Sequence, residues 1–304
     1  MKEAAPRSLY EPLKYVLAGG GKRIRPVLLM LSCEAVGGNA RKALHAGAAI
    51  EILHNFTLVH DDIMDNASSR RGRKTVHTKW DTNVAILVGD ELLALAYREL
   101  LLTKSDNIQS IAKIFTDGVV EVCEGQAYDK EFETRSGVTV NDYLLMIEKK
   151  TAKMVSAAAE IGALIGNGSP QGIRALRQYG HHVGLAFQIQ DDLLDIMANE
   201  EEFGKKIGGD LVEGKKTFLL LEAMGTARGN NKALLKELVA NKGCSADRIP
   251  EYRTIYVETG AAASARRRIE REINRSKQEL HRLPSTRAQA VLEWFADMLL
   301  HRTY

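Results

Sequence analysis

The sequence His60-Asp61-Asp62-Ile63-Met64-Asp65 places three carboxylates inside apolar sequence with helical periodicity. Residues four apart lie side by side on one helix face, so Asp61 and Asp65 point the same way, and Asp62 lies about 100° round the axis. Like charges at this spacing destabilise a helix unless a cation lies between them. The stretch therefore predicts a helix that binds cations.

A second copy of this pattern follows at Gln190-Asp191-Asp192-Leu193-Leu194-Asp195, again in an apolar frame. Aspartate oxygens are hard ligands suited to Mg²⁺, which proteins usually share between one or two carboxylates and substrate phosphates. A single Asp-x-x-x-Asp pair could equally be a solvated helix face, but two copies favour metal binding. Two such carboxylate pairs with Mg²⁺ between them would form a clamp for a diphosphate.

Composition indicates one large helical domain. Of 304 residues, 45% are hydrophobic and only 6 are proline, which favours a helical core over many turns and strands. No linker divides the chain, so we expect a single domain over residues 1–304. The net charge of +3 comes from 42 basic and 39 acidic side chains, a balance that argues against a nucleic-acid partner. The anionic partner is therefore expected to be small.

The three cysteines, Cys33, Cys123 and Cys244, are far apart and lack metal-ligand spacing, which predicts reduced thiols in the cytosol. No charged-then-apolar leader opens the chain, and no apolar run approaches the ~18 residues that a membrane span needs. We therefore expect a cytoplasmic protein that is not an integral membrane protein.

Apolar periodicity predicts a mainly helical chain, with the first aspartate stretch near the end of a helix over 40–66. On that helix His54, Leu58, Asp61 and Asp65 are spaced 4, 3 and 4, so they share a face. His54 could be a core residue or a ligand. The other expected helices cover an amphipathic segment within 1–18, then 26–36, 83–102, 108–133, 140–164 and 171–197, with further helices to the end.

Three basic stretches lie near these helices. Gly19-Gly20-Gly21 precedes Lys22-Arg23-Ile24-Arg25-Pro26, which fits phosphate capture or a plain turn between helices. Ser68-Ser69-Arg70-Arg71-Gly72-Arg73 places guanidinium groups directly after the first carboxylates. The glycine- and lysine-rich segment 199–216 predicts a mobile loop that closes over a phosphate, or a solvated linker.

These motifs, in this order, resemble the full set of the trans-type polyprenyl diphosphate synthases. The resemblance runs from about residue 17 to 217 and includes Gly125-Gln126, Lys150-Thr151 and Gln188-Ile189 before the second aspartate stretch, with Gly204-Lys205 after it. It implies an all-α, single-domain antiparallel helical bundle around a deep central cavity, the isoprenoid synthase fold. It also implies a homodimer, isoprenyl diphosphate substrates and about three Mg²⁺ ions per active site.

The resemblance assigns roles to individual residues. Metal binding falls to Asp61, Asp62, Asp65, Asp191, Asp192 and Asp195. Isopentenyl diphosphate would be held by Lys22, Arg25, His54 and Arg71, and the allylic diphosphate by Arg70, Lys150, Lys205 and Lys215. Lys150, Thr151 and Gln188 would lie near the reacting carbons. The lysine at 205 is doubled by Lys206, where one lysine is usual, and we expect Lys205 to contact the diphosphate.

The implied reaction is Mg²⁺-dependent prenyl transfer from a dimethylallyl, geranyl or farnesyl diphosphate to isopentenyl diphosphate. In the family, an aromatic residue five positions before the first aspartate goes with shorter products, and this chain has Phe56 there, followed by Thr57. That pair favours C20 geranylgeranyl diphosphate, with C15 farnesyl diphosphate as the alternative, and Leu92 or Leu93 could add to the cavity floor. More remote alternatives are a class I terpene cyclase, a metal phosphohydrolase and a non-catalytic helical partner subunit.

Overall fold

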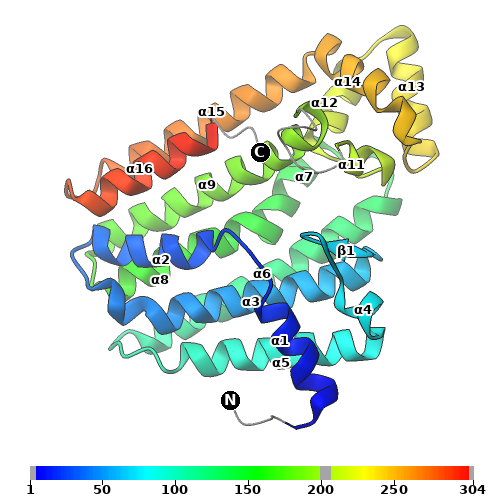
Figure 1. Ribbon diagram of the computed structural model, residues 1–304. Helices are drawn as coiled ribbons and strands as arrows, with labels where there is room; N and C mark the ends of the chain where they lie inside the picture. Colours follow the sequence, from blue (N-terminus) through cyan, green and yellow to red (C-terminus); the bar gives the residue numbers. More distant parts are fainter. Residues whose placement is uncertain (1–4, 199–206, 301–304) are drawn as a thin grey trace. The chain divides into compact units, whose positions relative to one another are not determined.

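The computed structural model describes residues 5–198 and 207–300, whose regular secondary structure is helical apart from one short β-hairpin (Figure 1). This confirms the prediction of an all-α fold. The chain forms two compact units, one of residues 1–115 and 158–169, the other of residues 116–157 and 170–304. The expectation of a single domain over 1–304 stays a prediction.

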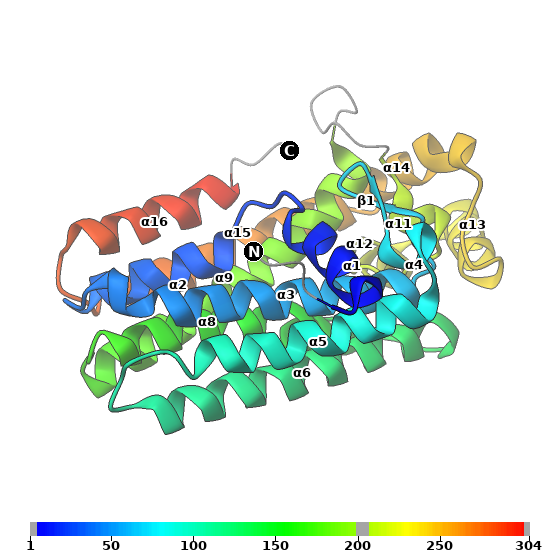
Figure 2. The same ribbon diagram turned by 60° about the horizontal axis from the view of Figure 1, so that its bottom comes forward.

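The first unit is organised around two antiparallel-packed long helices, α3 (Leu44–Met64) and α5 (Thr82–Leu100), which lie side by side in both views (Figures 1 and 2). Ile50 and Leu92 are fully buried on these helices. Gly89 permits the close approach, because an added Cβ would overlap the ring of His60. The remaining helices up to residue 100 are α1 (Arg7–Leu17), α2 (Ile24–Ala35), the 3₁₀ turn η1 (Ala40–Ala43) and α4 (Val76–Lys79).

A hairpin follows α3, formed by β1 (Ser69–Arg70) and β2 (Arg73–Lys74), where the sequence analysis identified a basic stretch and no strand. Its two central residues, Arg71 and Gly72, both have positive φ, at 53° and 72°. Left-handed conformations at both positions give the tight turn whose twist matches a two-stranded ribbon. The glycine makes the turn possible, and the two strands are too short to give a strong period-2 signal.

The second unit is built on α9 (Pro170–Met197) and α15 (Ala261–Leu280), which run along each other. Ile269 and Ile273 of α15 are buried, and the buried Tyr179 of α9 donates a hydrogen bond of 2.7 Å to the Leu292 carbonyl of α16. The other elements here are α7 (Val140–Ile147), α11 (Gly209–Val212), α12 (Phe218–Thr226), α13 (Gly229–Ala240), η3 (Ala246–Arg248), α14 (Ile249–Glu258) and α16 (Arg287–Leu300).

The predicted unbroken helix over 140–164 is wrong, because a π-helical segment, η2 (Glu148–Ala152), separates α7 from α8 (Lys153–Ile165). The side chains beyond such a segment are rotated about the helix axis relative to the side chains before it. Segments of π-helix often occur at functional sites. Gly125 of α6 (Ile108–Thr134) packs against this segment, since an added Cβ would overlap the backbone of Lys150.

The other predicted helices agree with the structure to within a few residues at each end. The segment 199–216 was expected to be a loop, but its described part contains the helical turn α11, and residues 199–206 lie outside the described residues. All three cysteines are free thiols. Over the described ranges, no helix combines the length and apolar character that crossing a membrane requires.

Candidate active site

The first aspartate motif lies at the carboxyl end of α3, with Asp65 as its C-cap residue, and its three carboxylates differ in exposure. Asp62 is buried, and Arg70 of the hairpin donates a hydrogen bond of 2.6 Å from Nε to its Oδ1. Burial raises the pKa of Asp62, against the opposing positive charge of Arg70. Asp61 and Asp65, which lie one helical turn apart, are both partly exposed. Asp62 thus anchors the hairpin, and the binding of a metal by Asp61 and Asp65 stays a prediction.

The residues predicted to bind isopentenyl diphosphate gather in the first unit. Arg71 donates a hydrogen bond from Nη1 to the Gly20 carbonyl, which ties the hairpin to the glycine-rich loop. Burial, followed by the positive charge of Arg25 and then Arg71, lowers the pKa of His54 well below its ordinary value of 6.5. His54 is therefore a neutral imidazole at pH 7, able to donate one hydrogen bond beside two arginines.

Arg23 holds the glycine-rich loop from the other end. Its guanidinium pairs with Glu51 of α3 at 2.5 Å and donates to the Gly19 carbonyl at 3.0 Å. Arg23 itself adopts φ +50°, an uncommon conformation for a residue other than glycine, directly before α2. These contacts present the loop, with Lys22 exposed beside Gly21, toward solvent.

The first cavity lies between α1, the glycine-rich loop, α3 and the hairpin. Its wall includes Asp62, Arg70 and Arg71 from the predicted site, together with Arg73 and Lys74, to which the sequence analysis gave no role. Such a cationic wall suits a phosphate ligand.

In the second unit, hydrogen bonds orient the residues predicted to lie near the reacting carbons. Thr151 of η2 donates to the Gln188 carbonyl oxygen at 3.0 Å, and Gln188 donates from its amide to Asp192 at 3.1 Å. The buried Tyr143 of α7 donates to the other oxygen of Asp192 at 2.6 Å. This chain of bonds determines which way the Gln188 amide points. Tyr143 was missed by the sequence analysis, because nothing local distinguishes it from a core tyrosine.

Three carboxylates crowd together around the second motif. Asp210, at the start of α11, donates from its backbone N–H to Asp195 at 3.1 Å. Burial, and next the charge of Asp210, raises the pKa of Asp192 to about 8 and that of Asp195 to about 6. Such crowding favours a bound cation. Asp210 was also missed, although its place after Gly208-Gly209 in a glycine-rich segment could have marked it.

Two predicted lysines pair with carboxylates in the described structure. Lys150 lies 2.5 Å from Asp129 of α6, and Lys215 lies 2.7 Å from Glu213 and 3.5 Å from Asp210. The second cavity includes both lysines in its wall, with Thr151, Gln188, Asp192 and Asp210. Lys205 and Lys206 lie outside the described residues.

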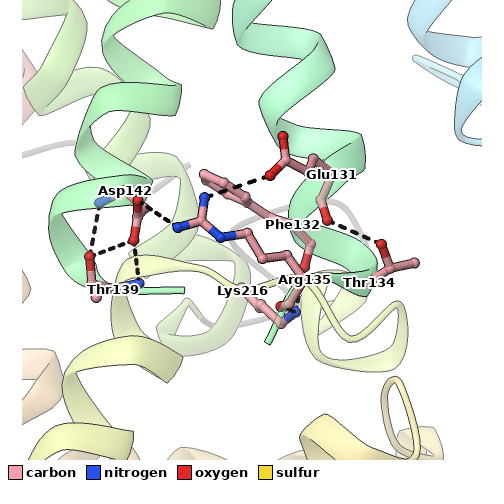
Figure 3. Close-up of polar contacts among 7 residues, drawn as sticks. All are labelled: Glu131, Phe132, Thr134, Arg135, Thr139, Asp142 and Lys216. Atoms are coloured by element: carbon pink, nitrogen blue, oxygen red, sulfur yellow. Dashed lines mark hydrogen bonds and ion pairs between the residues drawn. The ribbon is translucent and has the colours of Figure 1, made fainter. Parts of the chain in front are cut away.

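Lys216 has a different role from Lys215. It donates hydrogen bonds to the carbonyls of Phe132 and Arg135 at the carboxyl end of α6, the latter at 2.7 Å (Figure 3). Arg135 in turn pairs with Asp142, which forms the capping box of α7 with Thr139 (Figure 3). Lys216 therefore satisfies helix-end carbonyls and fastens the segment that carries Lys215 to α6.

The donor sets fit Mg²⁺. Among the described residues, no three His, Cys, Asp or Glu side chains form a complete metal site by themselves. Mg²⁺ keeps several waters and is usually bound by one or two carboxylates plus substrate phosphates, so a complete protein cage is not required. Asp61, Asp65 and Asp191 are partly exposed and would offer the hard oxygen ligands that this mode needs.

The predicted chain-length residues lie on the part of α3 that packs against α5. Phe56 is 8% exposed, and its ring lies 4.8 Å from the ring of His60, in an edge-to-face contact. Thr57 donates its hydroxyl to the His54 carbonyl at 2.9 Å. Leu92 of α5 is fully buried. Neither Phe56 nor Thr57 lines either of the two cavities described above.

Comparison with known proteins identifies the family. Residues 6–256 match the sequence model described as polyprenyl synthetase. The chain belongs to this family. It is 38% identical over its whole length to the short chain isoprenyl diphosphate synthase of Methanothermobacter thermautotrophicus, of which it covers 93%. A second polyprenyl synthetase relative, the geranylfarnesyl diphosphate synthase of Natronomonas pharaonis, is 37% identical over 98% of the chain and 91% of that protein.

The solved structures agree. The crystal structure of geranylgeranyl pyrophosphate synthetase from Pyrococcus horikoshii superposes with a TM-score of 0.93 at 36% identity, covering 99% of this chain and 92% of that one. The isoprenoid synthase fold is therefore confirmed. This polyprenyl synthetase is a prenyltransferase of the short-chain isoprenyl diphosphate synthase type, in a family of metal-dependent enzymes that use isoprenyl diphosphates. The roles of individual site residues stay predictions.

Proposed function

We propose that this synthase condenses isopentenyl diphosphate with allylic diphosphates to give C20 geranylgeranyl diphosphate as its main product. The observation that carries the product length is Phe56, a buried aromatic residue five positions before Asp61, followed by the smaller Thr57. A C15 product is the alternative. Relatives of nearly equal identity are named for geranylgeranyl and for geranylfarnesyl diphosphate, which makes the product length the property most in need of a direct test.

Prenyl transfer begins when diphosphate leaves the allylic carbon, so negative charge grows on the leaving group. When bound, about three Mg²⁺ ions supply the Lewis acidity that stabilises this charge. Asp61, Asp65 and Asp191 would hold the metal, with Asp62, Asp192 and Asp195 beside them. Arg70, Lys150, Lys205 and Lys215 bind the allylic diphosphate as cations already in place before charge develops.

The allylic carbocation needs neutral dipoles and the exclusion of water. The Thr151 hydroxyl and the Gln188 amide serve as these dipoles, and their hydrogen-bonded chain to Asp192 keeps them oriented. The double bond of isopentenyl diphosphate then attacks the cation, a new carbon–carbon bond forms, and the departed diphosphate takes the released proton. This reaction needs carboxylates to hold the metal and cations to bind diphosphate, which accounts for the composition of the proposed site.

Isopentenyl diphosphate is held by Lys22, Arg25, His54 and Arg71. The lowered pKa of His54 supports this role, because a neutral imidazole between arginines offers a hydrogen-bond donor without further charge repulsion. Arg71 reaches the site from the hairpin, where its bond to Gly20 joins it to the loop that carries Lys22.

We further propose that the protein acts as a cytoplasmic homodimer that pairs through α5. Ile86 and Leu87 on the outer face of α5 are 42% and 58% exposed. A two-fold contact would bury the same apolar patch from each copy. Sedimentation should give twice the mass of one chain, and the mass of a single chain would contradict the dimer.

The direct test incubates the protein with isopentenyl diphosphate, radiolabelled allylic diphosphate and Mg²⁺, and resolves the products by length. We expect prenyl diphosphates ending mainly at C20. A terpene cyclase would release cyclic hydrocarbon without consuming isopentenyl diphosphate, a phosphohydrolase would release prenol and phosphate, and a partner subunit alone would leave both substrates unchanged.

A further inference from the structure

Arg73 occupies a position on the hairpin that an anion would stabilise. Arg70 and Arg73 are direct cross-strand partners, so their side chains project from the same face of the two-stranded ribbon. Like charges directly opposite each other destabilise a strand pair. Arg70 is neutralised by Asp62, but no described residue forms an ion pair or side-chain hydrogen bond with the guanidinium of Arg73. The hairpin therefore keeps one cation available.

Tyr15 of α1 holds Arg73 in place. The Arg73 guanidinium carbon lies 3.8 Å from the centre of the Tyr15 ring, and the Tyr15 hydroxyl donates to the Lys74 carbonyl at 2.8 Å. The ring also contacts Lys79 at 3.9 Å and packs edge-to-face on Trp80 at 5.2 Å. A cation stacked on an aromatic face retains the N–H groups at its edge for a ligand.

The stacked guanidinium lies at the wall of the first cavity, next to the glycine-rich loop. A Cβ added at Gly19 would lie only 3.7 Å from Arg73 Nη1, so the loop backbone and the guanidinium are neighbours. Four cationic side chains and one carboxylate line this cavity, namely Arg70, Arg71, Arg73, Lys74 and Asp62. The surplus of positive charge points to an anion beside Gly19 and Gly20.

We propose that Arg73 binds the diphosphate of isopentenyl diphosphate, with Tyr15 as the residue that positions it. The inference rests on the proposed function and adds to it a diphosphate ligand and a positioning aromatic that the family motifs do not include. The isopentenyl substrate is chosen because Arg73 lies beside Gly19, in the loop that leads into Lys22 and Arg25. Arg71, which is proposed to bind the same diphosphate, lines the same cavity.

The test compares Arg73→Gln with wild type, measuring the KM of each substrate at saturating Mg²⁺ and saturating concentration of the other. Loss of one charge-assisted hydrogen bond should raise the KM for isopentenyl diphosphate roughly tenfold. The allylic KM and kcat should stay within about twofold of wild type, since no transition-state contact is removed. Lys79→Gln is the matched control, because it removes another cation from the Tyr15 ring but none from the cavity wall.

Two variants separate positioning from general structure. Tyr15→Leu should raise the KM for isopentenyl diphosphate about threefold through loss of the cation–π contact. Tyr15→Phe keeps the ring, so its KM should stay close to that of wild type. Melting curves of all variants establish folding. If Arg73→Gln does not fold, Arg73→Lys replaces it, with a smaller rise expected because the charge remains but the fork is lost.

An unchanged isopentenyl KM in folded Arg73→Gln, or a rise in the allylic KM alone, would overturn the assignment. Equal impairment of Tyr15→Phe and Tyr15→Leu would overturn the role of the ring. Failure of the proposed function would appear separately, as absence of prenyl transfer by the wild-type protein.

Discussion

At the scale of single residues, Asp61 and Asp191 are the most sensitive positions for the proposed metal chemistry. Asp61→Ala and Asp191→Ala should each lower kcat by a factor of roughly 100 or more, because each removes a hard oxygen ligand from the metal that stabilises the leaving group. Loss of a carboxylate also relieves like-charge repulsion, so the melting temperature without metal should not fall.

Steady-state rates over a range of Mg²⁺ concentrations, with circular dichroism for the fold, check this prediction. Glu270→Ala is the control, since it removes an exposed carboxylate from α15. Wild-type rates in either aspartate variant would show that the residue does not bind the catalytic metal.

His54 makes the stability of the folded protein depend on pH. Its pKa is lowered in the folded state, so the folded protein binds fewer protons than the unfolded chain below pH 6.5. The stability associated with this neutral group is fully present above about pH 6.5 and is lost as the pH falls. His54→Gln, a neutral donor that cannot titrate, should therefore reduce the fall in melting temperature between pH 7 and pH 5.

The same variant should keep the isopentenyl KM within a few-fold of wild type, whereas His54→Ala should raise it about tenfold through loss of a hydrogen bond to phosphate. Melting curves from pH 8 to 5 and KM values at pH 7.5 provide the measurements. An equal pH dependence in His54→Gln and wild type would mean that other groups control acid stability.

At the scale of elements, the π-helical segment η2 positions two site residues, Lys150 and Thr151. It packs tightly on α6, where Gly125 leaves no room for a side chain against the backbone of Lys150. Gly125→Ala should destabilise the fold by about 1–3 kcal/mol, as overpacking usually does. It should also lower kcat, since Thr151 and the Gln188 amide would lose their alignment.

Urea denaturation and steady-state kinetics check this prediction together. Gly225→Ala is the matched control, because a Cβ at that helical glycine meets no atom within 4 Å. Its stability should equal or exceed that of wild type, since alanine favours helix more than glycine does. Unchanged stability in Gly125→Ala would show that α6 and η2 can separate without cost.

At the scale of the whole molecule, product length depends on how far the growing chain can extend before it meets a floor. Phe56→Ala removes the largest side chain expected to form that floor, so its products should shift to C25 or beyond. In the wild-type structure the Phe56 ring packs on the ring of His60, which lies against Gly89 of α5. Removal of the Phe56 ring therefore also leaves space beside α5.

Separation of the products by chain length checks this prediction. Leu280→Ala, which opens a comparable buried space on α15, is the control and should lower stability without altering product length. The same distribution of products in Phe56→Ala and wild type would place the floor elsewhere, with Leu92 as the next candidate.

The sequence alone determined the helical class and the family, and it supplied the predictions for the site residues. Helices are visible because their apolar residues recur at a local period of 3.6, and the bounds of α6 and α9 follow from that period within a few residues. The two aspartate motifs are visible for a related reason. Carboxylates spaced four apart in apolar sequence are costly without a cation, so their chemistry can be inferred from neighbours along the chain.

Only the tertiary structure decided which groups meet. Arg70 pairs with Asp62, Lys150 with Asp129, and Tyr143 with Asp192, each pair joining separate elements. The π-helical segment and the hairpin register likewise depend on packing between elements, which local periodicity does not encode. The contact of Tyr15 with Arg73 is of the same kind, because cation–π attraction is weak and short-ranged and acts only after folding brings distant residues together.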